Sequence, residues 1–221
     1  MRIPTRFPLS RSAFLALVWV ALLASCHNQI ATPVLAADLK SIDLPKPQIT
    51  VGVPLMQALA QRKTTRAFRD QPLPLQTLSN LLWAAFGVNR PRSVKPGLGR
   101  TAPSAMNSQD IELDVLLADG VYVYDAEANR LRPFLSGDFR AKGSPEPAAH
   151  AAVTIIYVAA AKDDYAQVDT GFIGQNVYLF AASEGLNAWF YTFHAQDVAK
   201  ALNLPADKRA LYAQSIGYPP Q

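Results

Sequence analysis

A dense cluster of basic and hydroxyl side chains is formed by Arg62, Lys63, Thr64, Thr65 and Arg66, directly after a segment with helical spacing. An arginine guanidinium makes bidentate, charge-assisted hydrogen bonds to a phosphate group, and a threonine hydroxyl donates one more. Three cations and two hydroxyls within five residues therefore indicate a site for a phosphate monoester. The alternative is a solvated basic turn, which is the commoner role of a short run of charge.

A second polar cluster contains Ser104, Asn107, Ser108 and Gln109. Their hydroxyl and amide groups both donate and accept hydrogen bonds, which suits the edge of a sugar or of a ring system. Taken alone, the cluster is also typical of a polar loop that leads into a strand.

His194 is more typical of a strand end or a surface position than of a catalytic residue.

Metal sites and glycine-rich nucleotide loops have little support in the sequence. Cys26 is the single cysteine, and none of the three histidines stands in a carboxylate-rich helix motif. Neither G-x-G-x-x-G nor G-x-x-x-x-G-K-[ST] occurs, so neither familiar phosphate loop applies. We therefore expect no protein-built metal site.

The positive charge of the chain is concentrated near its N-terminus. The formal net charge is +4. Arg2, Arg6 and Arg11 precede the first acidic residue, Asp38, and without them 18 basic residues stand against 17 acidic ones. A balance so close to neutral argues against a basic surface of the kind that binds nucleic acid.

Residues 1–26 have the pattern of an export signal. Arginines are followed by an unbroken apolar or small stretch over residues 13–25, which is too short to span a membrane. The stretch ends in Leu-Ala-Ser-Cys, which is similar to a lipobox, so we predict that Cys26 is acylated and becomes the new N-terminus. The alternative is signal-peptidase cleavage after Ala36. Both alternatives place the mature protein outside the cytoplasm, in the periplasm. Only acylation of Cys26 would give it a membrane contact, through the lipid anchor.

The rest of the chain predicts one domain of the α+β class. Residues 27–50 lack a helical period and are predicted to be a tether or extended arm, and residues 51–221 to be the folded domain. Asp119-Gly120 predicts a hairpin, and residues 88–103 predict a long loop. Helices are expected at 54–62, 74–86, 169–184 and 195–202, and strands at 111–118, 121–125, 153–159, 187–193 and 211–218.

Five short motifs follow one another along residues 54–219. They are an opening helix leading into R-K-T-T-R-A-F, a second helix, P-S-A-M-N-S-Q before a strand, a long helix followed by G-L, and a closing G-Y-P. In this order they resemble the nitroreductase family of FMN-dependent enzymes. The pattern D-T-G-F-I-G-Q-N is most similar to the branch that includes the thiazole- and oxazole-forming dehydrogenases. The resemblance implies a mixed or antiparallel sheet flanked by helices, and a homodimer with FMN at the subunit interface.

Cofactor contacts are implied by the resemblance at the matching positions of the basic segment. Arg62 and Thr64 are implied to hold the FMN phosphate, with Lys63 as a further contact. Arg66 is implied to lie near the pyrimidine edge of the flavin, where a fixed guanidinium stabilises the negative charge of the reduced ring.

The polar loop and a strand end complete the implied site. Ser104 and Asn107 are expected to contact the cofactor. A backbone N–H at Thr192 or Phe193 is expected to reach the flavin N5. No catalytic side chain is implied by the resemblance.

The sequence as a whole predicts an exported FMN-dependent oxidoreductase. By the resemblance, two electrons or a hydride pass through flavin N5 to or from a small molecule or peptide. A nicotinamide donor is not expected outside the cytoplasm, so dehydrogenase or oxidase chemistry stays open beside nitro or quinone reduction. The alternative is an exported binding or assembly lipoprotein that retains the fold, with weak or no flavin binding and no catalysis.

Overall fold

A seven-stranded antiparallel sheet forms the centre of the described structure. The computed structural model describes residues 39–90, 99–142 and 144–221. The strands lie in the order β1-β6-β5-β4-β7-β9-β8, and every neighbouring pair is antiparallel. The predicted α+β class is confirmed, and the sheet is antiparallel rather than mixed.

The elements have the following bounds. The strands are β1 (Ile42–Asp43), β2 (Val88–Arg90), β3 (Gly99–Arg100), β4 (Glu112–Leu116), β5 (Gly120–Asp125), β6 (Arg130–Ser136), β7 (Val153–Ala160), β8 (Asn187–Tyr191) and β9 (Lys208–Gly217). The α-helices are α1 (Leu55–Gln61), α2 (Leu75–Phe86), α3 (Ala166–Ser183) and α4 (Ala195–Ala201). Two short 3-10 helices are η1 (Ala105–Asn107) and η2 (Glu146–His150).

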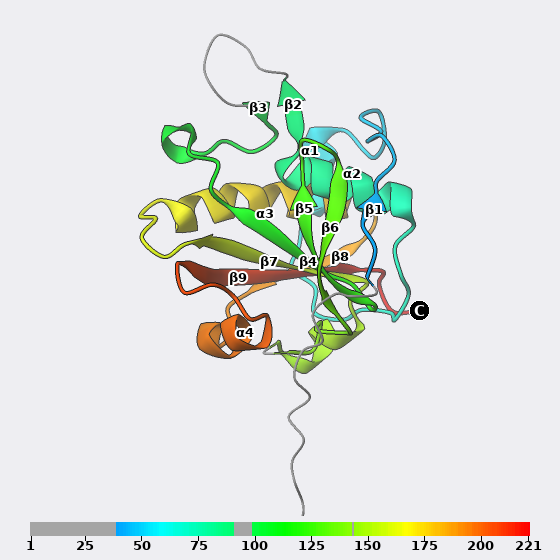
Figure 1. Ribbon diagram of the computed structural model, residues 1–221. Coiled ribbons are helices and arrows are strands. Elements are labelled where there is room, and N and C mark those ends of the chain that lie inside the picture. Colours follow the sequence, from blue (N-terminus) through cyan, green and yellow to red (C-terminus); the bar gives the residue numbers. More distant parts are fainter. Residues whose placement is uncertain (1–38, 91–98, 143) are drawn as a thin grey trace, which may run out of the picture. The chain divides into compact units, whose positions relative to one another are not determined.

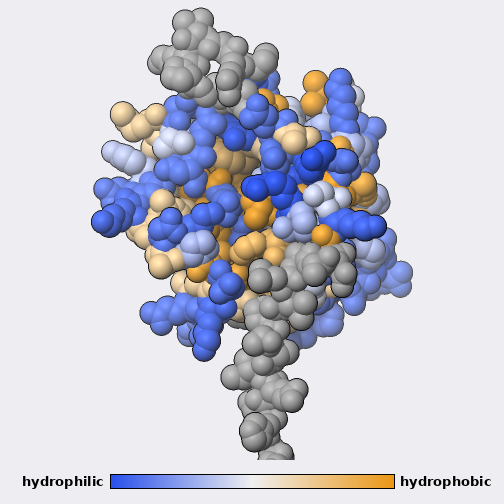
Figure 2. All heavy atoms as spheres, viewed as in Figure 1, coloured by the Kyte–Doolittle hydropathy of each residue, from blue (hydrophilic) through white to orange (hydrophobic). Residues whose placement is uncertain are grey.

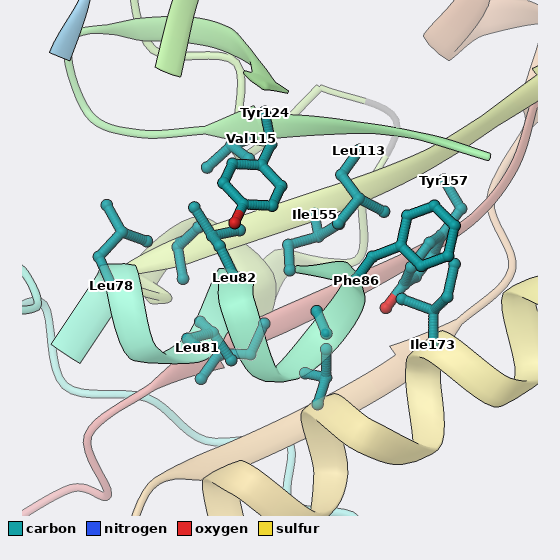
Figure 3. Close-up of a cluster of buried hydrophobic side chains, with 14 of the residues drawn as sticks. Leu78, Leu81, Leu82, Phe86, Leu113, Val115, Tyr124, Ile155, Tyr157 and Ile173 are labelled. Atoms are coloured by element: carbon teal, nitrogen blue, oxygen red, sulfur yellow. The ribbon is translucent and has the colours of Figure 1, made fainter. Parts of the chain in front are cut away.

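Helices lie on both faces of the sheet, with α1, α2 and α3 on one face and α4 on the other (Figure 1). One hydrophobic core lies beneath α2 and α3, where Leu81, Leu82 and Ile173 are completely buried (Figure 3). A second core lies beneath α4. Ile155 of β7 belongs to the first core and Ile156 to the second, because successive side chains of a strand face opposite sides. Burial on both faces explains why β7 is a continuous apolar run.

Most predicted elements are present close to their expected bounds. The hairpin at Asp119-Gly120 is confirmed, since β4 pairs antiparallel with β5 and Leu116 lies opposite Val121. Helix α3 begins earlier than the expected residue 169, because a local turn precedes it, in which the Asp163 carboxylate accepts the Tyr165 N–H at 2.9 Å. As a result, residue 169 lies in the first turn of α3.

Besides β1, two regions contain strands that the sequence did not predict. β6 pairs with β5 next to a bulge, and Pro133 lies within β6. Leu131 and Leu135 are buried on one face of β6, while a proline in a short run usually argues against a strand. β2 and β3 pair with each other at the base of the predicted loop 88–103. That region is therefore not irregular throughout.

The described part of the predicted tether lies against the domain. β1 pairs with β6, and Leu44 is buried. The Ser79 hydroxyl of α2 donates to the Pro45 carbonyl. Residues 39–50 are therefore an arm of the domain, because an extended segment satisfies its backbone groups by pairing with a sheet edge. The export signal and Cys26 lie outside the described residues.

Exposed hydrophobic side chains gather on two neighbouring helices. The face seen in Figure 2 is mostly hydrophilic, with hydrophobic residues near its centre. The large exposed hydrophobic residues include Leu55, Met56 and Leu59 on α1 and Val168 and Phe172 on α3. Continuous patches of exposed apolar side chains mark surfaces that contact other molecules. Within the described ranges, no helix has the length and apolar character needed to cross a membrane.

Candidate functional site

The basic segment predicted to bind phosphate runs along the outer edge of β8. The Thr65 N–H donates to the Ala188 carbonyl at 3.0 Å, and the Ala188 N–H donates to the Thr65 hydroxyl at 3.1 Å. Farther along, the Asn187 side chain donates to the Ala67 carbonyl at 2.6 Å. Because β8 is the last strand of the sheet, its edge fixes the basic segment in place.

Tyr178 of α3 contacts both predicted phosphate ligands. The guanidinium carbon of Arg62 lies 5.4 Å from the centre of the Tyr178 ring, in a cation–π contact. The Tyr178 hydroxyl accepts the Phe190 N–H at 2.8 Å and lies 3.0 Å from the Thr64 hydroxyl. Since it accepts from the backbone, its own proton is available to Thr64. Tyr178 thereby holds Arg62 and Thr64 at one place on the sheet edge.

Within the described part of the chain, the charges of the basic segment have no acidic neighbours at salt-bridge distance. Lys63 lines a cavity of about 410 Å³ beside α3 and the start of β8. The guanidinium of Arg66 lies 5.3 Å from the centre of the Trp189 ring. None of the ion pairs found among the described residues involves Arg62, Lys63 or Arg66. The segment therefore presents positive charge that an anion can neutralise.

The strand expected to supply the N5 amide ends earlier than predicted. β8 stops at Tyr191, so Thr192 and Phe193 follow it instead of belonging to it. Together with Ser144 and His194, they line a cavity of about 500 Å³. Beyond a strand end, the backbone N–H groups are no longer used by the ladder, so the position still suits the role that the resemblance implies.

Two charged residues that the sequence analysis did not select hold the polar loop. Asp169 is 1% exposed, and its two carboxylate oxygens lie 2.9 and 3.2 Å from the Ala105 nitrogen, whose N–H they accept. The Arg100 Nε donates to the Gln109 side-chain oxygen at 2.9 Å. The Ser104 hydroxyl accepts the Gln109 N–H at 2.8 Å. The loop is therefore fixed at both of its ends.

The polar loop has an unusual backbone. Met106, Asn107 and Gln109 have φ angles of 51°, 57° and 55°. Residues other than glycine rarely adopt this left-handed backbone conformation. Those that do cluster at functional sites, where the surrounding structure enforces the strain. The Met106 side chain is 88% exposed. The contacts of the loop therefore fix a conformation that turns Met106 toward solvent.

Within one chain, the two predicted parts of the site lie at different positions along α3, which is yellow in Figure 1. The polar loop is bonded to Asp169, and the basic segment contacts Tyr178. These two residues are nine positions apart in α3, which corresponds to about 14 Å along the helix axis. Ser104 and Asn107 therefore lie near one end of α3, and Arg62 lies farther along it.

Of the two α3 residues that hold the site, the sequence pattern marks Asp169 but not Tyr178. Asp169 is the first residue of the D-x-G-x-x-x-Q-N pattern, so the sequence marks its position but not its contact with Ala105. Tyr178 lies in a mostly apolar helix and carries no sequence signal. Among the residues of known placement, no three His, Cys, Asp or Glu side chains come together as a metal site requires.

Replacing Asp169 by alanine is expected to lower the free energy of unfolding by about 2 kcal/mol, because the Ala105 N–H loses a charged acceptor. Urea unfolding measures the change. The matched control is Asp164→Ala, which removes an exposed carboxylate just before α3. Equal losses in the two variants would contradict the role given to Asp169.

The fold and the site define a class of protein in which helices cover an antiparallel sheet and a basic segment lies along its last strand. The chain belongs to the nitroreductase family, whose family model matches residues 59–218. The resemblance at the family level is thus confirmed, and it places the chain among oxidoreductases. The likeness to the thiazole- and oxazole-forming branch stays a prediction.

Several relatives share this architecture. A protein of Methanocaldococcus jannaschii described as a nitroreductase is 28% identical, over 76% of this chain and 93% of that protein. The crystal structure of a protein of Ralstonia eutropha described as a nitroreductase is 33% identical, with a TM-score of 0.75, and covers 86% of this chain and 94% of that one. The Escherichia coli microcin synthetase complex has a TM-score of 0.59 at 20% identity, over 84% of this chain and 80% of that one, and shares the fold.

Proposed function

We propose that this chain is an exported FMN-dependent oxidoreductase that passes two electrons, as a hydride, through the flavin N5 to or from a small molecule or peptide. The observation that carries the proposal is the basic segment on the edge of β8. Its three cations have no ion-pair partner among the described residues, and Tyr178 holds Arg62 and Thr64 side by side.

The residues present fit FMN at its phosphate and at its ring. Arg62 and Thr64 would hold the phosphate, with Lys63 beside them, since a guanidinium and a hydroxyl match a phosphate dianion. Arg66, held over Trp189, would lie at the pyrimidine edge and favour negative charge there. When bound, FMN supplies the hydride chemistry, and the protein supplies binding, orientation and charge.

Two observations support a site built between two copies of the chain. The polar loop and the basic segment are attached to α3 at Asp169 and Tyr178, about 14 Å apart along the helix axis, so the groups that one copy presents to a flavin are spread along this helix. The exposed hydrophobic residues of α1 and α3, Leu55, Met56, Leu59, Val168 and Phe172, are between 42% and 77% exposed. A homodimer that buries these helices would bring Ser104 and Asn107 of one copy toward the basic segment of the other.

Reconstitution with FMN tests the proposed function. The chain without residues 1–26 is expected to bind FMN, to turn yellow and to sediment as a dimer at micromolar concentration. Riboflavin is the matched control, because it lacks the phosphate and should bind at least about 10-fold more weakly. A colourless monomer that cannot be reconstituted would favour the alternative, a binding or assembly lipoprotein.

Export by the lipoprotein route predicts that Cys26→Ala leaves a precursor that is unprocessed or cut elsewhere. The protein should then leave the membrane fraction, because the acylated cysteine is its anchor. Cell fractionation and the mass of the mature protein measure both effects. Unchanged mass and fractionation would instead support cleavage after Ala36.

A further inference from the structure

A polar pocket lies at the base of the β2–β3 hairpin, beside the polar loop. Its volume is about 280 Å³, just below the range of roughly 300–1,000 Å³ that is common for ligand sites. Most of its lining side chains end in a polar or charged group. They are Asn89, Arg90, Arg100, Thr101, Ser104, Asn107 and Gln109.

The charge of this region is positive. Among the described residues that line the pocket, two are arginines and none is acidic. The other polar groups are amides and hydroxyls, which also donate hydrogen bonds. A pocket with this lining matches an anion better than a cation or a neutral apolar molecule.

Arg100 is held rigidly in the pocket wall. It donates through Nε to Gln109 at 2.9 Å and through a terminal nitrogen to the Phe86 carbonyl at 3.3 Å. Its guanidinium carbon lies 4.9 Å from the centre of the Phe86 ring. These contacts use part of its five N–H groups, so others remain for a ligand.

The charge of Arg100 is only partly compensated. Burial lowers the pKa of Arg100, and the more distant Tyr124, Glu127 and Asp125 raise it again. The Asp125 carboxylate already accepts the N–H groups of Glu127 and Ala128. None of these acidic groups lies in the pocket lining or within ion-pair distance of Arg100 in the described structure. A half-buried cation of this kind is stabilised by an anionic ligand.

We propose that this pocket binds the carboxylate group of a small organic acid through Arg90 and Arg100, and that such acids are the substrate class of the enzyme. The proposal rests on the proposed function, because the polar loop that lines the pocket is also the loop expected to contact FMN. The carboxylate is held by the two guanidinium groups, and Asn89 and Ser104 donate to its remaining oxygen lone pairs, since the Thr101 hydroxyl already donates to the Trp83 carbonyl. The volume is sufficient for an acid of the size of a benzoate.

Titration of the FMN-loaded protein with benzoate and with its neutral isostere benzamide tests this inference. Calorimetry is expected to show benzoate binding about 10-fold more tightly, with a preference that falls at high salt. Arg90→Gln should remove most of the preference without unfolding, because Arg90 is exposed. Arg132→Gln, which removes an exposed arginine outside the pocket, should leave the preference unchanged.

A second readout separates substrate binding from cofactor binding. In single-turnover experiments, protein reduced with one equivalent of dithionite is mixed with excess 4-nitrobenzoate or 4-nitrobenzamide, and reoxidation of the flavin is followed. Arg90→Gln should raise the concentration of the acid that gives half of the maximal rate. It should leave the maximal rate, and the rates with the amide, unchanged. Equal affinity for benzoate and benzamide in the parent protein would overturn the proposal. So would an Arg90→Gln variant that binds FMN more weakly but benzoate equally well, since the pocket would then serve the cofactor phosphate. If no FMN binds at all, the proposed function fails, whereas the benzoate titration still decides whether the pocket takes carboxylates.

Discussion

The free energy of unfolding is expected to fall by about 5 kcal/mol between pH 4 and pH 8 because of Asp114, and replacing Asp114 by asparagine is expected to remove this dependence. Asp114 lies in the middle of β4 and is completely buried. Neither of its carboxylate oxygens has a hydrogen-bond partner in the described structure. Burial raises its pKa to about 8, with a smaller contribution from Glu112, while Lys208 acts in the opposite direction.

The direction of the effect follows from proton binding. In the unfolded chain the pKa of Asp114 is near its ordinary value of 3.8, and in the folded chain it is about 8. Between these values the folded state binds more protons than the unfolded state, so stability falls as pH rises. The full stability is present below about pH 4, and the loss approaches about 1.4 kcal/mol per pH unit until pH 8.

Urea unfolding at pH 5, 6, 7 and 8 measures this slope. Asp114→Asn is neutral at every pH, so the difference in stability between variant and parent should grow in favour of the variant as pH rises. Asp114→Leu should behave in the same way and avoids an unpartnered amide in the core. The control is Asp197→Asn on the exposed side of α4. If the free energies of unfolding of the parent and of Asp114→Asn changed in parallel with pH, the raised pKa of Asp114 would be contradicted.

Replacing Arg62 by alanine is expected to weaken FMN binding by about 10- to 150-fold. A charge-assisted hydrogen bond contributes about 1.5–3 kcal/mol, and its loss leaves the phosphate charge unpaired. The variant also removes the cation–π contact with Tyr178. Arg62→Lys should recover part of the affinity, because a point charge cannot reproduce the bidentate guanidinium. Thr64→Ala should have a smaller effect, near that of one hydrogen bond.

Equilibrium titration with FMN and with riboflavin measures these changes. The loss in Arg62→Ala should appear for FMN and be small for riboflavin, because only FMN carries the phosphate. Arg66→Ala gives the contrasting case: it should lower the reduction potential of bound flavin more than the affinity, since its guanidinium favours the reduced, negatively charged ring. If Arg62→Ala binds FMN as well as the parent, the basic segment is a solvated turn.

The helices and most of the central strands were predictable because local patterns specify them. The spacing of Leu78, Leu81 and Leu82 places one face of α2 in the core, and Asp119-Gly120 specifies the β4–β5 hairpin. β1, β2 and β3 were not predictable in the same way. Each has only two or three residues and exists through its pairing partner, which lies elsewhere in the chain.

By itself, the sequence determined the family, the α+β class and the residue types that suit a phosphate and a flavin, because motifs and periodicity are local properties. Only the tertiary structure decided how these residues are held. It placed Thr65 against Ala188, Arg62 on Tyr178 and Ala105 on Asp169, in each case across more than 60 residues of chain. It also left the Asp114 carboxyl without a hydrogen-bond partner among the residues that the structure describes. Such contacts depend on which distant segments pack together, and no short stretch of sequence contains that information.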